Sequence, residues 1–435
     1  MQLTEEQVLA LAPDDASRKA GKDLASPNKW LTKATGPQAL WGECQGSGSK
    51  PYQTQVDLAG MAFKCSCPSR KFPCKHGVGL LILYACNAAS FTPAEPPAWV
   101  NEWLAKRSEK EEKKADKKDK PVDEAAQAKR LQAREQGVED GLAELLLWIK
   151  DIVRNGLIGV PEKDPAFFSN MARRMVDAKA TGLAALVKTA GNTNFYAEGW
   201  QSGFMDLLVR MYLLITGFTH RAQLPAALQE DVRSLIGFTQ SQDELKAQTG
   251  ITDTWLVLGK QTTEEDNLTV ERNWLYGIQT QRSALVLQFS VMGQGFTYNL
   301  LPGTAIQAEL VYYPSTQPLR AIIKQQQGTG QAPVPAMLNG WQQVAEIEAT
   351  LHSTLPFSSE RPYILQQLTP VQYQGRWCLA DQQQHIMPVT PGFAGIWQLL
   401  SVSGGLPLDM AVVGKEHAFE PLGIWSNGQY IGLYH

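Results

Sequence analysis

Four side chains of types that bind transition metals lie within 12 consecutive positions, in the segment Cys65-Ser-Cys67-Pro-Ser-Arg-Lys-Phe-Pro-Cys74-Lys-His76. A structural zinc ion takes four nitrogen or sulfur ligands in a tetrahedron, and Cys65, Cys67, Cys74 and His76 supply that number. The chain has only six cysteines in 435 residues, too few for a disulfide scaffold. We therefore expect these four residues to hold one structural zinc ion (Zn2+) in a reducing compartment.

Two other interpretations of this segment are a metal-free group of reduced cysteines with a core histidine, and a catalytic zinc site. A catalytic site keeps a water ligand and usually has a carboxylate base nearby. No Asp or Glu occurs between Lys64 and Glu95, so structural zinc is favoured. Cys86 would lie about 15 Å further along a helix at 1.5 Å per residue, too far to share the metal, and Cys44 belongs to a different predicted strand.

The residues around the four ligands predict strands followed by a helix. Segments 41–46, 52–58 and 61–67 are the expected strands, and the third of them would deliver Cys65 and Cys67 at its end. Residues two apart on a strand point to the same face, so the one-residue spacing of these cysteines suits a shared metal. A helix beginning at Lys75 or His76 would place Cys74 at its N-terminus, where the helix dipole favours thiolate.

This pattern resembles the SWIM zinc finger, in which Cys-x-Cys and Cys-x-His follow a short β-meander and precede a helix. Cys65, Cys67, Cys74 and His76 match it residue by residue, and the resemblance extends over residues 35–90. The overall layout, together with the segment 171–184, is similar to bacterial multi-domain SWIM zinc finger proteins, some of which are encoded near MoxR-type AAA ATPases and von Willebrand factor A proteins. The resemblance implies zinc, and contacts with either DNA or protein.

Composition and hydrophobic period divide the chain into four parts, and together they predict an α+β multidomain protein. Residues 1–105 form the SWIM-type zinc-finger domain, a small β-meander plus a helix. Residues 106–124 are a charged linker, since such a segment cannot bury enough apolar surface to fold. Residues 125–250 form a central bundle of about five helices, with apolar positions at 3.6-residue spacing. Residues 251–435 form a mainly antiparallel β domain.

Several local signals refine this division. Asp164 and Pro165 are a helix N-cap and first turn, and residues 197–217, apolar on most sides, are expected to be the central helix of the bundle. In the β domain the sequence does not decide between a barrel and a sandwich. One helix is expected there over residues 341–355, and Asn427-Gly428 predicts a type I′ hairpin turn.

Two further pairs of titratable residues attract attention in the β domain. Glu348 and His352 are expected to be a solvated pair on the predicted helix. Cys378 and His385 flank a polar turn and could face one another across a hairpin, without an expected function.

The candidate contact residues for a partner lie in and beside the loop between Cys67 and Cys74, which we call the metal loop. Residues 16–80 hold ten Lys or Arg and three Asp or Glu, although the whole chain has a net charge of -3. Such a basic region favours polyanions or an acidic partner surface. The candidates are Lys64, Arg70, Lys71, Phe72 and Lys75. The alternative is that these charges are ordinary solvated side chains that offset the roughly one negative charge of three thiolates with Zn²⁺.

Three functions follow from these observations. The first is a non-enzymatic zinc-finger protein whose basic finger binds nucleic acid (DNA) or protein. The second is a protein-interaction adaptor of a MoxR-type AAA ATPase and von Willebrand factor A system. The third is an enzyme in the β domain. It is the least favoured, because the chain contains no P-loop, Rossmann, Gly-x-Ser-x-Gly or His-Glu-x-x-His motif. No signal peptide or membrane span is apparent, so we expect a cytoplasmic protein that does not enter the membrane.

Overall fold

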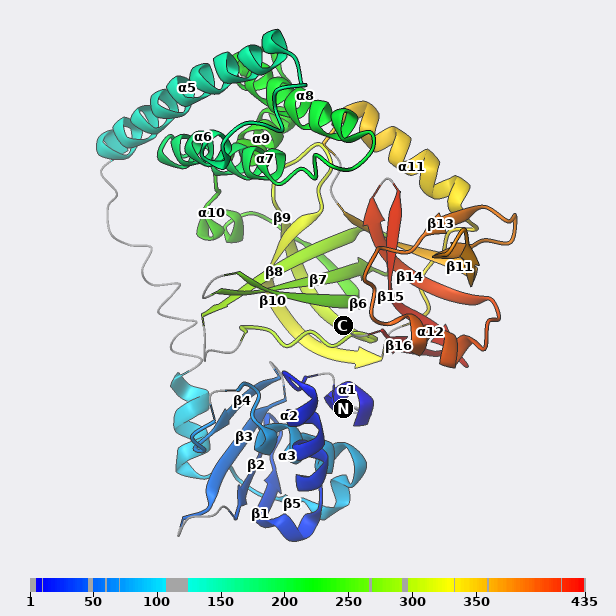
Figure 1. Ribbon diagram of the computed structural model, residues 1–435. Coiled ribbons are helices and arrows are strands. Elements are labelled where there is room, and N and C mark those ends of the chain that lie inside the picture. The colour runs from blue at the N-terminus through cyan, green and yellow to red at the C-terminus, as the bar shows by residue number, and fades with distance from the viewer. Residues whose placement is uncertain are drawn as a thin grey trace.

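A computed structural model shows the chain as three regions in sequence order: an N-terminal domain that carries the predicted metal ligands, which we call the zinc-finger domain after that prediction, a helical bundle and a β-rich region (Figure 1). The α+β class is confirmed. The residues that the structure describes are 5–9, 11–45, 50–58, 61–69, 71–106, 124–265, 268–291, 296–331, 333–357, 360–415 and 417–433. Most of the predicted linker, residues 107–123, lies outside them. Among the described helices, none combines the length and apolar character that a membrane crossing requires.

The N-terminal domain is a sheet covered by helices. Its strands are β1 (Trp30–Thr35), β2 (Ala39–Cys44), β3 (Tyr52–Asp57), β4 (Ala62–Cys65) and β5 (Thr92–Pro93), in the order β4-β3-β2-β1-β5. The apolar helix α3 (Lys75–Cys86) lies between this sheet and two helices not expected from the sequence, α1 (Glu5–Leu9) and α2 (Asp15–Leu24). Glycines allow α2 and α3 to approach closely: a Cβ on Gly21 would lie 2.7 Å from Val78 Cγ1.

The helical bundle is built on the long helix α5 (Glu124–Asn155). It is followed by α6 (Pro165–Asp177), α7 (Thr181–Gly191), α8 (Trp200–Thr219), α9 (Ala226–Ile236) and the short α10 (Gln242–Lys246). The side chain of Asp164 accepts from the Ala166 N–H at 2.7 Å, which confirms the predicted N-cap. Helix α7 was not expected. The helix expected over 197–217 is confirmed as α8, but it is not a central helix buried on most sides, because it exposes Val209, Tyr212 and Leu213 on one side.

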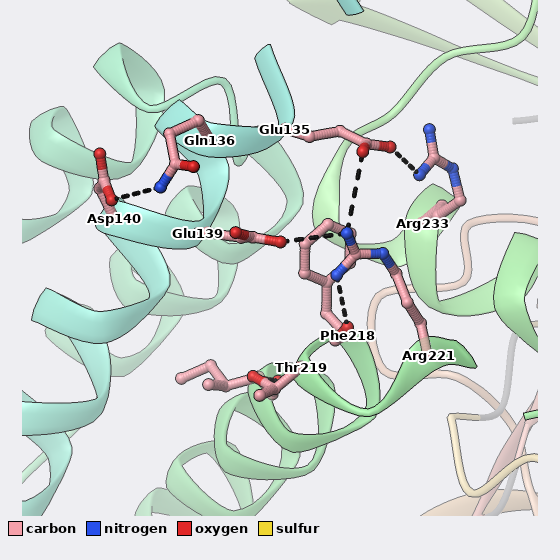
Figure 2. A network of polar contacts seen from close by, with 9 residues as sticks. Glu135, Gln136, Glu139, Asp140, Phe218, Thr219, Arg221 and Arg233 are labelled. Atoms are coloured by element: carbon pink, nitrogen blue, oxygen red, sulfur yellow. Dashed lines mark hydrogen bonds and ion pairs between the residues drawn. The ribbon is translucent and has the colours of Figure 1, made fainter. Parts of the chain in front are cut away.

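Ion pairs join α5 to the C-terminal ends of α8 and α9 (Figure 2). Glu135 on α5 pairs with Arg233 on α9 at 2.6 Å and with Arg221, just after α8, at 3.7 Å. Glu139, one turn further along α5, pairs with Arg221 at 3.0 Å. The apolar side of this amphipathic helix, which includes Val138, Leu142 and Leu145, lies in the bundle core.

The β-rich region contains a closed barrel and an open sheet, which settles the alternative between barrel and sandwich. The barrel strands are β6 (Ile251–Glu265), β7 (Leu268–Gly277), β8 (Ser283–Val291), β9 (Thr304–Tyr312) and β10 (Arg320–Gln331). Their order is β10-β8-β7-β6-β9. A short parallel pairing of β10 with β8 and a long antiparallel pairing with β9 close the barrel.

The open sheet follows helix α11 (Trp341–Thr354) and packs on the barrel. Its order is β13-β12-β11-β14-β15-β16. The elements are β11 (Arg361–Tyr373), β12 (Arg376–Ala380), β13 (Ile386–Pro388), α12 (Ile396–Ser403), β14 (Leu408–Lys415), β15 (Ala418–Ser426) and β16 (Gln429–Gly432). Asn427 and Gly428 have φ of 50° and 75°, as a type I′ turn requires. A shared core that includes Leu258, Trp274 and Ile364 joins barrel and sheet.

Direct contacts also join the three regions to one another. Asp231 of α9 is buried and accepts hydrogen bonds from the Ser315 hydroxyl at 2.5 Å and the Thr316 N–H at 2.8 Å, between bundle and barrel. Leu301, which precedes β9, is buried in the core of the N-terminal domain. The zinc-finger domain is therefore packed against the barrel, below it in Figure 1.

Candidate metal centre

The four predicted zinc ligands lie together at the junction of β4 and α3. Strand β4 ends at Cys65, Cys67 follows in a bend, and Cys74 is the N-cap residue of α3, with His76 in its first turn. Their ligand atoms all lie within 4.8 Å of one another, and Cys65 Sγ is 3.8 Å from His76 Nδ1. Cys74 and His76 are buried, and Cys65 and Cys67 are half-buried. We refer to these residues as the Cys₃His cluster.

The cluster has the chemistry of a site for a divalent cation. A hydrogen bond from the Cys74 thiol, with further ones from His76 and Thr54, lowers the pKa of Cys65 to about 4. The same hydrogen bond to Cys65, followed by burial, raises the pKa of Cys74, and burial raises the pKa of Cys67. One thiolate therefore forms readily, but three thiolates this close need a cation to balance their charge. Cysteine thiolate and imidazole are the ligands that zinc prefers, so the cluster can bind zinc.

Strand β3 supports the cluster from one side. The Thr54 hydroxyl lies 3.2 Å from Cys65 Sγ, and Thr54 is directly opposite Cys65 in the β3–β4 pairing. The Tyr52 ring packs on the His76 ring with centroids 5.0 Å apart. Sequence reasoning did not single out either residue. The signal that could have found them is strand register, since Tyr52 and Thr54, two apart on β3, point to the same face of the sheet, and Thr54 lies opposite Cys65 on β4.

The predicted contact residues differ in how far they are available to a partner. Lys71 forms an ion pair with Asp14 at 2.5 Å, which ties the metal loop to the start of α2 and lowers the pKa of Asp14 to about 2. Phe72 packs on the domain core and meets the Phe63 ring edge to face at 6.3 Å. Lys64 and Lys75 are exposed. Arg70 lies outside the described residues.

The other cysteines do not join the cluster. Cys44 is buried on β2, and Cys86 is exposed at the far end of α3. Cys378 and His385 do not face each other as a pair. The Cys378 thiol contacts the Arg376 carbonyl at 3.9 Å, and His385 Nδ1 lies 3.2 Å from Asp381 Oδ2.

Glu348 and His352 do lie together, with His352 Nδ1 3.6 Å from Glu348 Oε2, but the expectation that the pair is solvated was wrong for Glu348. Glu348 is only 9% exposed and accepts a hydrogen bond from the Tyr363 hydroxyl. Helix α11 lies against the open sheet, so the face that carries Glu348 is covered by β11, a long-range contact that helical spacing does not reveal.

Comparison with known proteins identifies two parts of the chain. Residues 52–85, which span β3, β4, the Cys₃His cluster and most of α3, match the SWIM zinc finger family. Residues 133–236, from α5 to α9, match the SWIM-associated four-helix bundle domain. No curated protein and no solved structure gives a significant match to the chain. The chain therefore contains a SWIM zinc finger, with its four candidate metal-binding side chains close together, and after it the helical domain associated with that finger.

Proposed function

We propose that the Cys₃His cluster holds one structural zinc ion and that the protein is a non-enzymatic interaction protein that binds a protein partner. The observation that carries this proposal is the ligand set: Cys65, Cys67, Cys74 and His76 offer four sulfur and nitrogen ligand atoms within 4.8 Å of one another, the number that a tetrahedral zinc site takes. Structural zinc sites are closed in this way, whereas catalytic sites keep one position for water. Over the described residues, no other group of three or more His, Cys, Asp or Glu side chains is arranged to hold a metal.

Metal analysis tests the zinc part of the proposal. We expect about one zinc per chain in reduced protein purified without chelators, since structural zinc binds peptides of this kind with about 10–16 kcal/mol near pH 7. Cys74→Ser should lose the metal. Cys86→Ser is the matched control because it removes an exposed thiol outside the cluster, and it should keep the zinc. Reduced wild-type protein without zinc would refute the proposal.

A protein partner is favoured over nucleic acid because two of the predicted contact residues are engaged within the domain. Lys71 pairs with Asp14, and Phe72 packs on the core instead of presenting a ring for base stacking. The metal loop is therefore part of the domain's own packing. The resemblance to SWIM proteins encoded near MoxR-type AAA ATPases and von Willebrand factor A proteins makes an ATPase complex of that class the partner to test first.

DNA binding is the second candidate, supported by the exposed Lys64 and Lys75 on either side of the cluster. Each phosphate contact steepens the dependence of log K on log salt by about 0.9. If DNA were the target, Lys64→Gln with Lys75→Gln would reduce that slope by up to about two, and Lys188→Gln, on α7, would not.

The two candidates are separated by titrating the purified protein against labelled duplex DNA and against a purified MoxR-type ATPase. The protein-partner proposal expects an ATPase complex that survives the double lysine variant. Salt-sensitive DNA binding that depends on Lys64 and Lys75, without ATPase binding, would overturn it.

A further inference from the structure

One end of the barrel interior is polar and charged. The other end is filled by apolar side chains such as Trp255, Leu275 and Ile306. At the polar end, Lys260 Nζ lies 3.7 Å from Glu271 Oε2, and both side chains are largely buried, 18% and 6% exposed. The amides of Asn273 and Gln288 donate to Glu271 Oε1 at 3.0 and 3.1 Å. We call these four residues the barrel-end cluster.

The barrel-end cluster is an energetically unfavourable group of side chains to bury in a protein core. Burying an ion pair costs desolvation that hydrophobic residues of the same volume would avoid. In addition, Asn273 is fully buried and its Oδ1 has no hydrogen-bond partner among the described residues. A buried acceptor left unpaired is unfavourable. These groups are therefore better suited to an end of the barrel that opens to water than to a permanently closed core.

A segment between β8 and β9, residues 296–303, covers this end of the barrel, and we call it the strap. The Tyr298 N–H donates to Gln288 Oε1 at 2.8 Å, and Gln288 Nε2 donates back to the Tyr298 carbonyl at 2.7 Å. Leu300 is buried in the barrel core. The inner side of the strap is thus bonded to the barrel-end cluster.

The outer side of the strap belongs to the zinc-finger domain. Asn299 Nδ2 donates to the Met61 carbonyl, and Leu301, 3% exposed, is buried in the core of that domain. Met61 immediately precedes β4, the strand that ends in the zinc ligand Cys65. Neighbouring strap residues, Leu300 and Leu301, therefore anchor in two different cores.

We propose that the zinc-finger domain is a cap that holds the strap closed over the barrel-end cluster. When the cap leaves, the strap loses its outer anchor, and Lys260 and Glu271 become accessible to solvent and to polar ligands. Resting on the proposed zinc site, the inference extends to the metal: losing zinc frees the Cys65 end of β4, loosens the hairpin that presents Met61, and releases the cap.

Lysine labelling of the full-length protein tests the cap. Wild type and Asn299→Ala/Leu301→Ala are treated briefly with acetic anhydride, and acetylation of each lysine is measured by mass spectrometry. Lys324 is the internal control, because it is a barrel lysine whose ammonium pairs with Glu309 at 2.9 Å and donates to the Gln248 carbonyl, neither of which belongs to the strap. Leu31→Ala is the control variant, because Leu31 is a 62% exposed residue of the same domain.

In the double variant, acetylation of Lys260 relative to Lys324 should rise about tenfold or more, because truncating a buried leucine removes more energy than such a shift in an opening equilibrium needs. Leu31→Ala should match wild type. An unchanged rate of Lys260 acetylation would overturn the proposed role of the cap. A parallel rise at Lys324 would also overturn it, because that result reports opening of the whole barrel.

Removing zinc from wild type with a chelator should also raise Lys260 acetylation selectively. If the double variant responds and the zinc-depleted protein does not, the link to the metal is wrong while the cap stands. Zinc content, measured separately, shows whether the proposed metal site itself has failed.

Discussion

Replacing Thr54 by valine should weaken zinc binding without removing a ligand. Thr54 is completely buried, and its hydroxyl lies 3.2 Å from Cys65 Sγ. In the zinc-bound state Cys65 is a thiolate, which can only accept, so the hydroxyl must donate to it. Valine keeps the shape and the strand preference of threonine but leaves the sulfur without this donor.

The size of the effect follows from the charge on the acceptor. A hydrogen bond to a charged group contributes about 1.5–3 kcal/mol, and 1.4 kcal/mol corresponds to a tenfold change in an equilibrium constant. Partners in the outer shell of metal sites typically change affinity by about 10–100-fold. We therefore expect Thr54→Val to raise the Kd for zinc by about 10–100-fold.

Competition with a chromophoric chelator measures this Kd. Thr54→Ser restores a hydroxyl at the same position and should recover most of the affinity. Thr32→Val makes the same chemical change on β1, where the hydroxyl faces Glu43 at 3.3 Å on the exposed side, and should bind zinc like wild type. Thr54→Val protein that is folded and has the wild-type Kd would refute the argument.

Two further predictions concern packing and pH. Gly182→Ala should lower the free energy of unfolding by about 1–3 kcal/mol or more, because its Cβ would lie 1.9 Å from the Leu235 carbonyl oxygen and force α7 away from α9. Gly203→Ala on α8 meets nothing within 4 Å and should instead stabilise the bundle by up to about 1 kcal/mol in urea unfolding. Burial acts to raise the pKa of Asp381, but hydrogen bonds from the Trp341 and His385 N–H groups outweigh it and lower that pKa. The ionised form therefore adds stability at neutral pH that is lost as the pH falls through the lowered pKa. The stability difference between wild type and Asp381→Asn should accordingly shrink in acid, and a difference independent of pH would contradict this reasoning.

The metal centre could be predicted from the sequence because its ligands are local. Cys65, Cys67, Cys74 and His76 lie within one strand end, one loop and one helix start, so their spacing alone implies that they meet. Caps and tight turns are local in the same sense. Asp164 reaches an N–H two residues away, and Asn427-Gly428 sets its own backbone angles.

Some secondary structure escaped prediction because intrinsic preferences are weak compared with tertiary packing. Helix α2 is mostly polar, so its sequence shows no strong apolar stripe, whereas α7 places Leu183, Leu186, Val187 and Ala190 at i, i+3, i+4 and i+7, a pattern that the sequence-based prediction missed. Each forms where its glycine lets it pack closely on a neighbouring helix, Gly182 against α9 and Gly21 against α3. Such close approaches depend on the partner surface, which local propensity does not describe.

Only the tertiary structure decided which side chains surround the metal and how the domains meet. Thr54 finds Cys65 through strand register, and Lys71 finds Asp14 across 57 positions of chain. The charge pattern alone marked Lys71 as free for a partner, but the fold places a carboxylate beside it. The strap also makes a contact that only the fold reveals, because its Leu301 enters the core of a domain that lies more than 200 residues earlier in the chain. Composition and spacing determine which residues are able to bind a metal or a partner, and chain folding determines which of them are already occupied by contacts distant in sequence.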